Sequence, residues 1–126
     1  MQTTRPVFLT LWQIKLPLTA VVSILHRISG IAMVVSIPVA AYLFHLALSS
    51  PDGYAAALAV YDSWYIWPLR MFVFWGLLHH LIAGIRHLFM DYDFWLEREQ
   101  SRLTAQVTLT AAVSLLVLLL ALGALI

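Results

Sequence analysis

The sequence contains no cysteine and few charges of either sign. Of its 126 residues only 10% are charged, whereas 63% are hydrophobic, and the formal net charge is +1. The absence of cysteine excludes disulfides, thiolate-bound iron–sulfur clusters and the C-x-x-C-H attachment of c-type haem. Nucleic-acid binding needs a basic stripe, which this charge balance does not supply. Because soluble domains are typically about a quarter charged, the composition indicates an integral membrane protein.

Long apolar stretches make up most of the chain, and a membrane-spanning helix needs roughly 20 such residues. We predict spans over residues 19–48, 66–90 and 103–126, preceded by an interfacial segment over 1–18. Turn-forming residues at 49–53 are expected to end the first span. The predicted fold class is therefore all-α, a single membrane-anchor domain of three transmembrane helices within a multi-subunit helical bundle.

Lysine and arginine are concentrated at one side of these spans. Arg5, Lys15 and Arg27 lie at the N-terminal side, and Arg86, Arg98 and Arg102 flank the second connection. The connection 49–67 has no basic residue, and Arg70 is the only one near that face. The positive-inside rule then places the N-terminus and the second connection in the cytoplasm and the C-terminus outside. Aromatic residues in the first connection fit the outer interface belt.

The second span carries histidines in two directions. His80, Gly84 and His87 follow i, i+4, i+7 spacing and share one stripe, whereas His79 points about 100° away. His80 lies about 16 Å from the Asp91 end, near mid-membrane. A neutral imidazole there has a lone pair that water cannot satisfy, and Gly84 leaves room for a flat macrocycle. His87 is placed to meet an anionic group such as a haem propionate. The alternative is that these histidines only pack against neighbouring helices.

The first span opens with Ser23, His26, Arg27 and Gly30 within eight residues. Ser23, Arg27 and Gly30 share a stripe, with His26 beside it. The hydroxyl and the guanidinium converge near the predicted cytoplasmic interface, where they fit the carbonyl oxygens of a quinone. Arg27 is also able to pair with an acidic group of a cofactor. The alternative is that Arg27 extends to lipid phosphates.

The remaining polar residues have simpler interpretations. We interpret Arg70 as an arginine that extends to the outer lipid headgroups, and His45 as a polar packing residue. The charged run 91–102 fits a solvated loop or a short interfacial helix, or else a docking surface for a soluble partner.

Three stretches carry a resemblance to a known family. They are Arg5-Pro6 with residues 15–20, the run Ser-Ile-Leu-His-Arg-Ile-Ser-Gly at 23–30, and His80 through Gly-Ile-Arg-His at 84–87 to Asp91. In order and spacing they resemble the cytochrome b556 family, the larger membrane anchors of succinate dehydrogenase (succinate:quinone oxidoreductase).

The resemblance implies one b-type haem shared with a second anchor subunit. His80 is then the axial ligand of the iron, the other ligand being a histidine of the second anchor. His26 and His87 are implied to lie near its propionates, and Arg27 and Gly84 near the haem.

The resemblance further implies a ubiquinone site to which Ser23 and Arg27 contribute. The expected function is transfer of electrons from succinate to quinone in a bacterial cytoplasmic membrane. FAD and iron–sulfur clusters are expected on partner chains only, a flavoprotein subunit and an iron–sulfur subunit, where the dicarboxylate chemistry also lies. Either direction, succinate oxidation or fumarate reduction, fits these residues. A function of another class is a non-redox helper of a transporter or channel, with the histidines as a proton relay.

Overall fold

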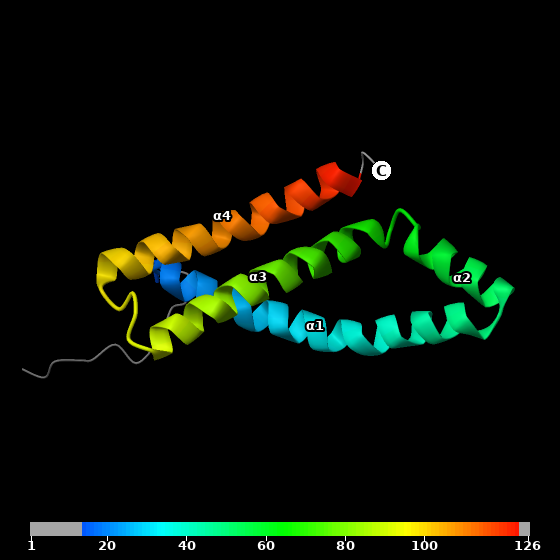
Figure 1. The fold of residues 1–126 in the computed structure, drawn as a ribbon, viewed down its shortest axis with the longest axis horizontal. Coiled ribbons are helices and arrows are strands. Elements are labelled where there is room, and N and C mark those ends of the chain that lie inside the picture. The colour runs from blue at the N-terminus through cyan, green and yellow to red at the C-terminus, as the bar shows by residue number, and fades with distance from the viewer. Residues whose placement is uncertain (1–13, 124–126) are drawn as a thin grey trace, which may run out of the picture.

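The computed structural model describes residues 14–123. Its helices are α1 (Leu18–Ser49), α2 (Pro51–Tyr61), α3 (Trp67–Asp91) and α4 (Arg98–Gly123), and the described part contains no strand. In Figure 1, α1, α3 and α4 run along the molecule, and α2 connects α1 to α3 at one end. Three of the helices, all but α2, are long and apolar enough to cross a membrane. The predicted all-α fold with three transmembrane helices is confirmed.

The long helices exceed the thickness of a bilayer. α1 has 32 residues and α3 has 25, which correspond to about 48 Å and 38 Å at 1.5 Å per residue. Since the hydrocarbon core is about 30 Å thick, both helices extend into the headgroup regions or cross at a tilt. Of the predicted N-terminal interfacial segment, residues 1–13 lie outside the described residues, whereas Lys15 is described and exposed.

The predicted turn at 49–53 ends α1 and also begins α2. The Ser50 side chain accepts a hydrogen bond from the Gly53 backbone nitrogen (2.9 Å), Pro51 opens the helix, and Asp52 lies in its first turn. These residues form a helix N-terminus, because a serine cap, an early proline and an acidic first turn each favour helix initiation. The sequence analysis predicted no helix in this connection, so α2 is a correction.

Arg70, which we interpreted as extending to the outer lipid headgroups, has partners within the chain. Its guanidinium donates a hydrogen bond to the Tyr61 carbonyl (2.8 Å) and lies 4.1 Å from the Tyr61 ring centroid. It also lies 3.8 Å from an Asp62 carboxylate oxygen. Arg70 therefore fastens the start of α3 to the end of α2.

The second connection is shorter than the charged run 91–102. α4 begins at Arg98, with Glu99 in its first turn, where a negative charge suits the helix dipole. Only residues 92–97 lie between α3 and α4, and Asp93 (φ 64°) and Trp95 (φ 60°) adopt left-handed backbone conformations there. These two residues reverse the chain so that α4 returns along α3.

Small side chains allow the three long helices to approach closely. Val22 of α1, Ala83 of α3 and Ala105 of α4 form a buried cluster. Gly76 of α3 faces Ser29 of α1. Membrane helices associate through such small-residue contacts because lipid offers no hydrophobic penalty to drive packing. α3 contacts both α1 and α4, so the two sides of α3 face different neighbours.

Candidate functional site

The crossing of α1 and α3 brings three histidines together. The ring centroids of His26 and His80 lie 4.0 Å apart with their planes inclined by only 13°. The rings of His26 and His87 lie 5.1 Å apart and are tilted by 58°. Gly84 belongs to the same place, since a Cβ atom built on it would lie 3.4 Å from Nε2 of His26. The structure thus brings together four of the predicted site residues.

The hydrogen bonds of His80 determine which of its nitrogens carries the proton. Nδ1 lies 3.0 Å from the backbone carbonyl oxygen of His26, which can only accept. Nδ1 therefore carries the hydrogen, and Nε2 of the neutral ring keeps its lone pair. Among residues 14–123, Nε2 has no hydrogen-bond partner and is not one of the buried unpartnered atoms, so it opens onto the surface of the chain. Metal-binding histidines commonly donate their other ring N–H to a carbonyl in this way.

A glycine on α1 gives the imidazole ring of His80 its room. A Cβ atom on Gly30 would lie 3.1 Å from Cε1 of His80, which is tighter than ordinary contact. Gly30 on α1 thus makes space for the ring from α3. Gly84 on α3 lies beside the ring of His26, where a Cβ atom would be 3.4 Å from Nε2, at the edge of ordinary contact.

The histidines do not converge on a metal ion by themselves. Within the described residues, no group of three or more histidine or acidic side chains is placed to hold a metal. Nε2 of His26 is buried without a hydrogen-bond partner. The cluster has nitrogens that are neither buried nor hydrogen-bonded in the described residues, among them Nε2 of His80 and those of His87, so any enclosed metal site needs further ligands from another molecule.

Ser23 and Arg27 lie beside this cluster on α1. Within residues 14–123 neither side chain makes a hydrogen bond or an ion pair, and Arg27 is exposed while Ser23 is half-buried. Both groups are therefore available to a ligand or a partner at this surface. Their assignment to a quinone site stays a prediction.

The sequence analysis gave no role to His79 or to Arg86, which follows it at i+7 and so forms a second stripe of α3. His79 is fully buried (0% exposed), stacks on Trp75 at 5.1 Å, and leaves both ring nitrogens without partners in the described part of the chain. Arg86 is 4% exposed and donates to Thr104 Oγ1 (3.1 Å) and to Ser101 Oγ (3.0 Å) and O (3.1 Å) on α4. The hydroxyl residues at the start of α4 were the signal that a polar partner on α3 faces them.

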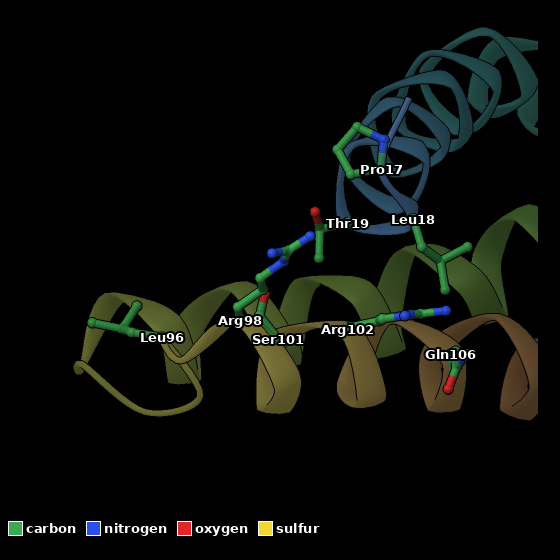
Figure 2. A pocket seen from close by; sticks show the side chains of 8 residues that line it. All are labelled: Pro17, Leu18, Thr19, Leu96, Arg98, Ser101, Arg102 and Gln106. Carbon is green, nitrogen blue, oxygen red and sulfur yellow. The ribbon is translucent and has the colours of Figure 1, made fainter. Parts of the chain in front are cut away.

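Two further features of the described residues lie away from the histidine cluster. His45 is exposed on α1 and has no part in the cluster. A cavity of about 610 Å³ lies where α1 and α4 begin. Figure 2 shows its lining side chains, with Arg98 extending from α4 toward Thr19 at the start of α1. None of the predicted site residues lines this cavity. The predicted chemistry therefore concentrates on the α1–α3 face.

Comparison with known proteins places these features in a family. A family model of the succinate dehydrogenase/fumarate reductase transmembrane subunit matches residues 1–120. The chain is 38% identical over 114 residues to the succinate dehydrogenase cytochrome b556 subunit of Paracoccus denitrificans, covering 90% of this chain and 88% of that protein. It is 36% identical over 110 residues to the cytochrome b556 subunit of Coxiella burnetii (83% and 85% covered). The succinate dehydrogenase cytochrome b560 subunit of Reclinomonas americana is 30% identical over 117 residues (89% and 81%). The matches and the three apolar helices agree, and the chain belongs to the succinate dehydrogenase/fumarate reductase transmembrane subunit family.

Proposed function

We propose that this chain is the haem b-binding anchor of succinate dehydrogenase and forms one wall of its ubiquinone-reduction site. The observation that carries the proposal is the state of His80. Its Nδ1 is engaged by the His26 carbonyl at 3.0 Å while Nε2 is open at the surface. Unsatisfied polar groups are costly inside a membrane-spanning helix, and an accessible Nε2 is one that a group from another molecule can satisfy.

The residues around His80 fit a haem b in chemistry and in space. Nε2 of His80 is the proposed axial ligand, and a histidine of a second anchor subunit is the proposed other one. When bound there, haem b would supply reversible one-electron transfer, and two histidine ligands would suit that role. Gly84 leaves the helix surface bare beside the ring, and His87, His26 and Arg27 are donors for the propionates.

Ser23 and Arg27 are the proposed contribution of this chain to the ubiquinone site. The hydroxyl of Ser23 donates a hydrogen bond to a quinone carbonyl oxygen. The guanidinium of Arg27 stabilises the negative charge that develops on the quinone oxygens during reduction. Both groups are free of internal partners in residues 14–123, as groups reserved for a ligand should be. The second anchor and the iron–sulfur subunit complete the site.

The proposed orientation follows from the distribution of basic residues. Lys15, Arg98 and Arg102 lie at the end of the molecule where α1 and α4 begin, and the positive-inside rule assigns that end to the cytoplasm. The C-terminus then lies on the periplasmic side of the bacterial cytoplasmic membrane. The cytoplasmic end is where the iron–sulfur subunit docks, with the FAD-carrying flavoprotein beyond it, so that the dicarboxylate chemistry takes place outside this chain.

A reduced-minus-oxidised spectrum of the purified complex tests the haem proposal. We expect the bands of a six-coordinate haem b, one haem for each copy of this chain, and flavin that co-purifies. A colourless complex without soluble partners contradicts the proposal and favours the non-redox helper with a histidine proton relay.

Replacement of Ser23 or Arg27 by alanine tests the quinone proposal. Loss of a hydrogen bond to a charged or polarised partner costs about 1.5–3 kcal/mol, so we expect quinone reduction to fall roughly 10- to 100-fold. Succinate oxidation with a soluble dye acceptor should persist, because it does not need the membrane site. Equal loss of both activities indicates failed assembly and contradicts the assignment of these residues to the quinone.

A further inference from the structure

Ser29 of α1 is fully buried (0% exposed), and its hydroxyl contacts both the backbone of His26 and the ring of His80. Its hydroxyl donates a hydrogen bond to the His26 carbonyl (2.8 Å), three residues earlier on the same helix. Serines in membrane helices often make such a bond to their own helix. Ser36 makes the same bond to the Met33 carbonyl at the same 2.8 Å distance. The bond within α1 therefore does not set Ser29 apart.

What sets Ser29 apart is its second neighbour, on the other helix. Its Oγ lies 3.2 Å from Nδ1 of His80, and Ser36 has no corresponding partner in the described residues. The hydroxyl proton of Ser29 is directed to the His26 carbonyl, so the oxygen offers a lone pair to the Nδ1 hydrogen. That hydrogen then has two acceptors, the Ser29 oxygen at 3.2 Å and the His26 carbonyl at 3.0 Å.

Two acceptors on one N–H group have consequences for the rest of the ring. They fix the plane of the imidazole and exclude the tautomer in which Nε2 carries the hydrogen. They also draw the Nδ1 hydrogen outward, which makes Nε2 a stronger electron donor. Gly30, the next residue on α1, leaves the space into which the ring is turned. The short segment from His26 to Gly30, which we call the seat, thus holds the imidazole of His80 on the other helix in one orientation.

We propose that Ser29 is a positioning residue that acts through His80 and sets its strength as an iron ligand. This inference rests on the proposed function, in which Nε2 of His80 binds the haem iron. A stronger donor stabilises the ferric state, so Ser29 holds the midpoint potential of the haem below the value that the His26 carbonyl alone would give.

The test is Ser29→Ala in the assembled, purified complex. Alanine fills nearly the same volume, and the His26 carbonyl still accepts from Nδ1, so no buried group loses its last partner and the haem is retained. We expect the midpoint potential to rise and the g values of the low-spin ferric EPR signal to shift. Ser29→Cys keeps the volume but hydrogen-bonds weakly, and we expect it to follow alanine. Ser29→Thr restores a hydroxyl, and we expect it to move both readouts back toward the wild type.

Ser36→Ala is the matched control, because it removes the same bond within α1 without touching His80. We expect the potential and the EPR signal of this variant to equal those of the wild type. The inference is overturned if Ser29→Ala leaves both readouts unchanged, or if Ser36→Ala shifts them equally. Failure of the proposed function looks different, since then His80→Ala keeps the wild-type haem spectrum or the wild-type complex holds no haem.

Discussion

The two polar stripes of α3 contain the same kinds of residue and are used in opposite ways. His79 and Arg86 are buried, the histidine with both ring nitrogens inaccessible and the arginine hydrogen-bonded to α4. His80 and His87 are turned toward α1 and keep nitrogens that are not buried. The difference teaches that an unpartnered nitrogen marks a candidate ligand only where another molecule can reach it, as at Nε2 of His80 and unlike the buried nitrogens of His79.

We expect the largest effect on the haem spectrum from His80→Ala. With the open nitrogen removed, we expect the six-coordinate haem spectrum of the complex to be lost or strongly weakened. The matched variant is His79→Leu, which replaces the adjacent imidazole by an apolar side chain of similar volume. Since neither nitrogen of His79 has a partner in the described residues, we expect its haem spectrum to match the wild type. Haem loss of equal size in both variants would remove the distinction between the stripes.

Arg86→Leu tests the structural role of the buried stripe. The guanidinium makes three hydrogen bonds to α4, and hydrogen bonds to a charged group contribute about 1.5–3 kcal/mol each, although not additively. We expect the free energy of unfolding of the complex to fall by about 2–3 kcal/mol. Denaturation of the purified complex in a detergent series measures this. His79→Leu should change the same quantity by less than about 1 kcal/mol, because neither ring nitrogen makes a hydrogen bond of ordinary geometry in the described residues. A haem-specific defect in Arg86→Leu at wild-type stability contradicts this division of roles.

A pair of glycine variants gives the smallest and most specific effect. Gly30 and Gly76 both lie between α1 and α3, but a Cβ on Gly30 would meet the His80 ring at 3.1 Å, whereas one on Gly76 would meet Ser29 at an ordinary 3.6 Å. We expect Gly30→Ala to displace the His80 ring and shift the haem absorption maximum. Gly76→Ala should leave the spectrum unchanged. The same shift in both variants would show that the α1–α3 spacing, and not the seat of His80, controls the spectrum.

The architecture was largely predictable because it follows from the bilayer. Three apolar stretches of sufficient length leave a membrane protein few alternatives, and the structure has three such helices. The stripe of His80, Gly84 and His87 was predictable for a similar reason, since helical spacing fixes which residues share a face. The family resemblance was also visible in these residues, and the family match over residues 1–120 agrees with it.

What the sequence did not reveal depends on contacts between helices. His26 and Ser29 each lie more than 50 positions before His80 in the sequence, and no periodicity along one helix indicates that they contact it. Arg86 and Ser101 also lie on different helices, so helical spacing does not indicate their contact either. α2 was missed because its capping residues, Ser50 to Gly53, were interpreted only as a turn. Arg70 was assigned to lipid because its partner Tyr61 lies on that unpredicted helix.

A structure of the complete complex, with its second membrane anchor, is the most direct test of the account. We predict a haem iron coordinated by Nε2 of His80, with Nδ1 still donating to the His26 carbonyl and the porphyrin lying between the two anchors. A structure in which Nε2 of His80 bonds to a backbone carbonyl or a lipid, with no porphyrin between the chains, would contradict it.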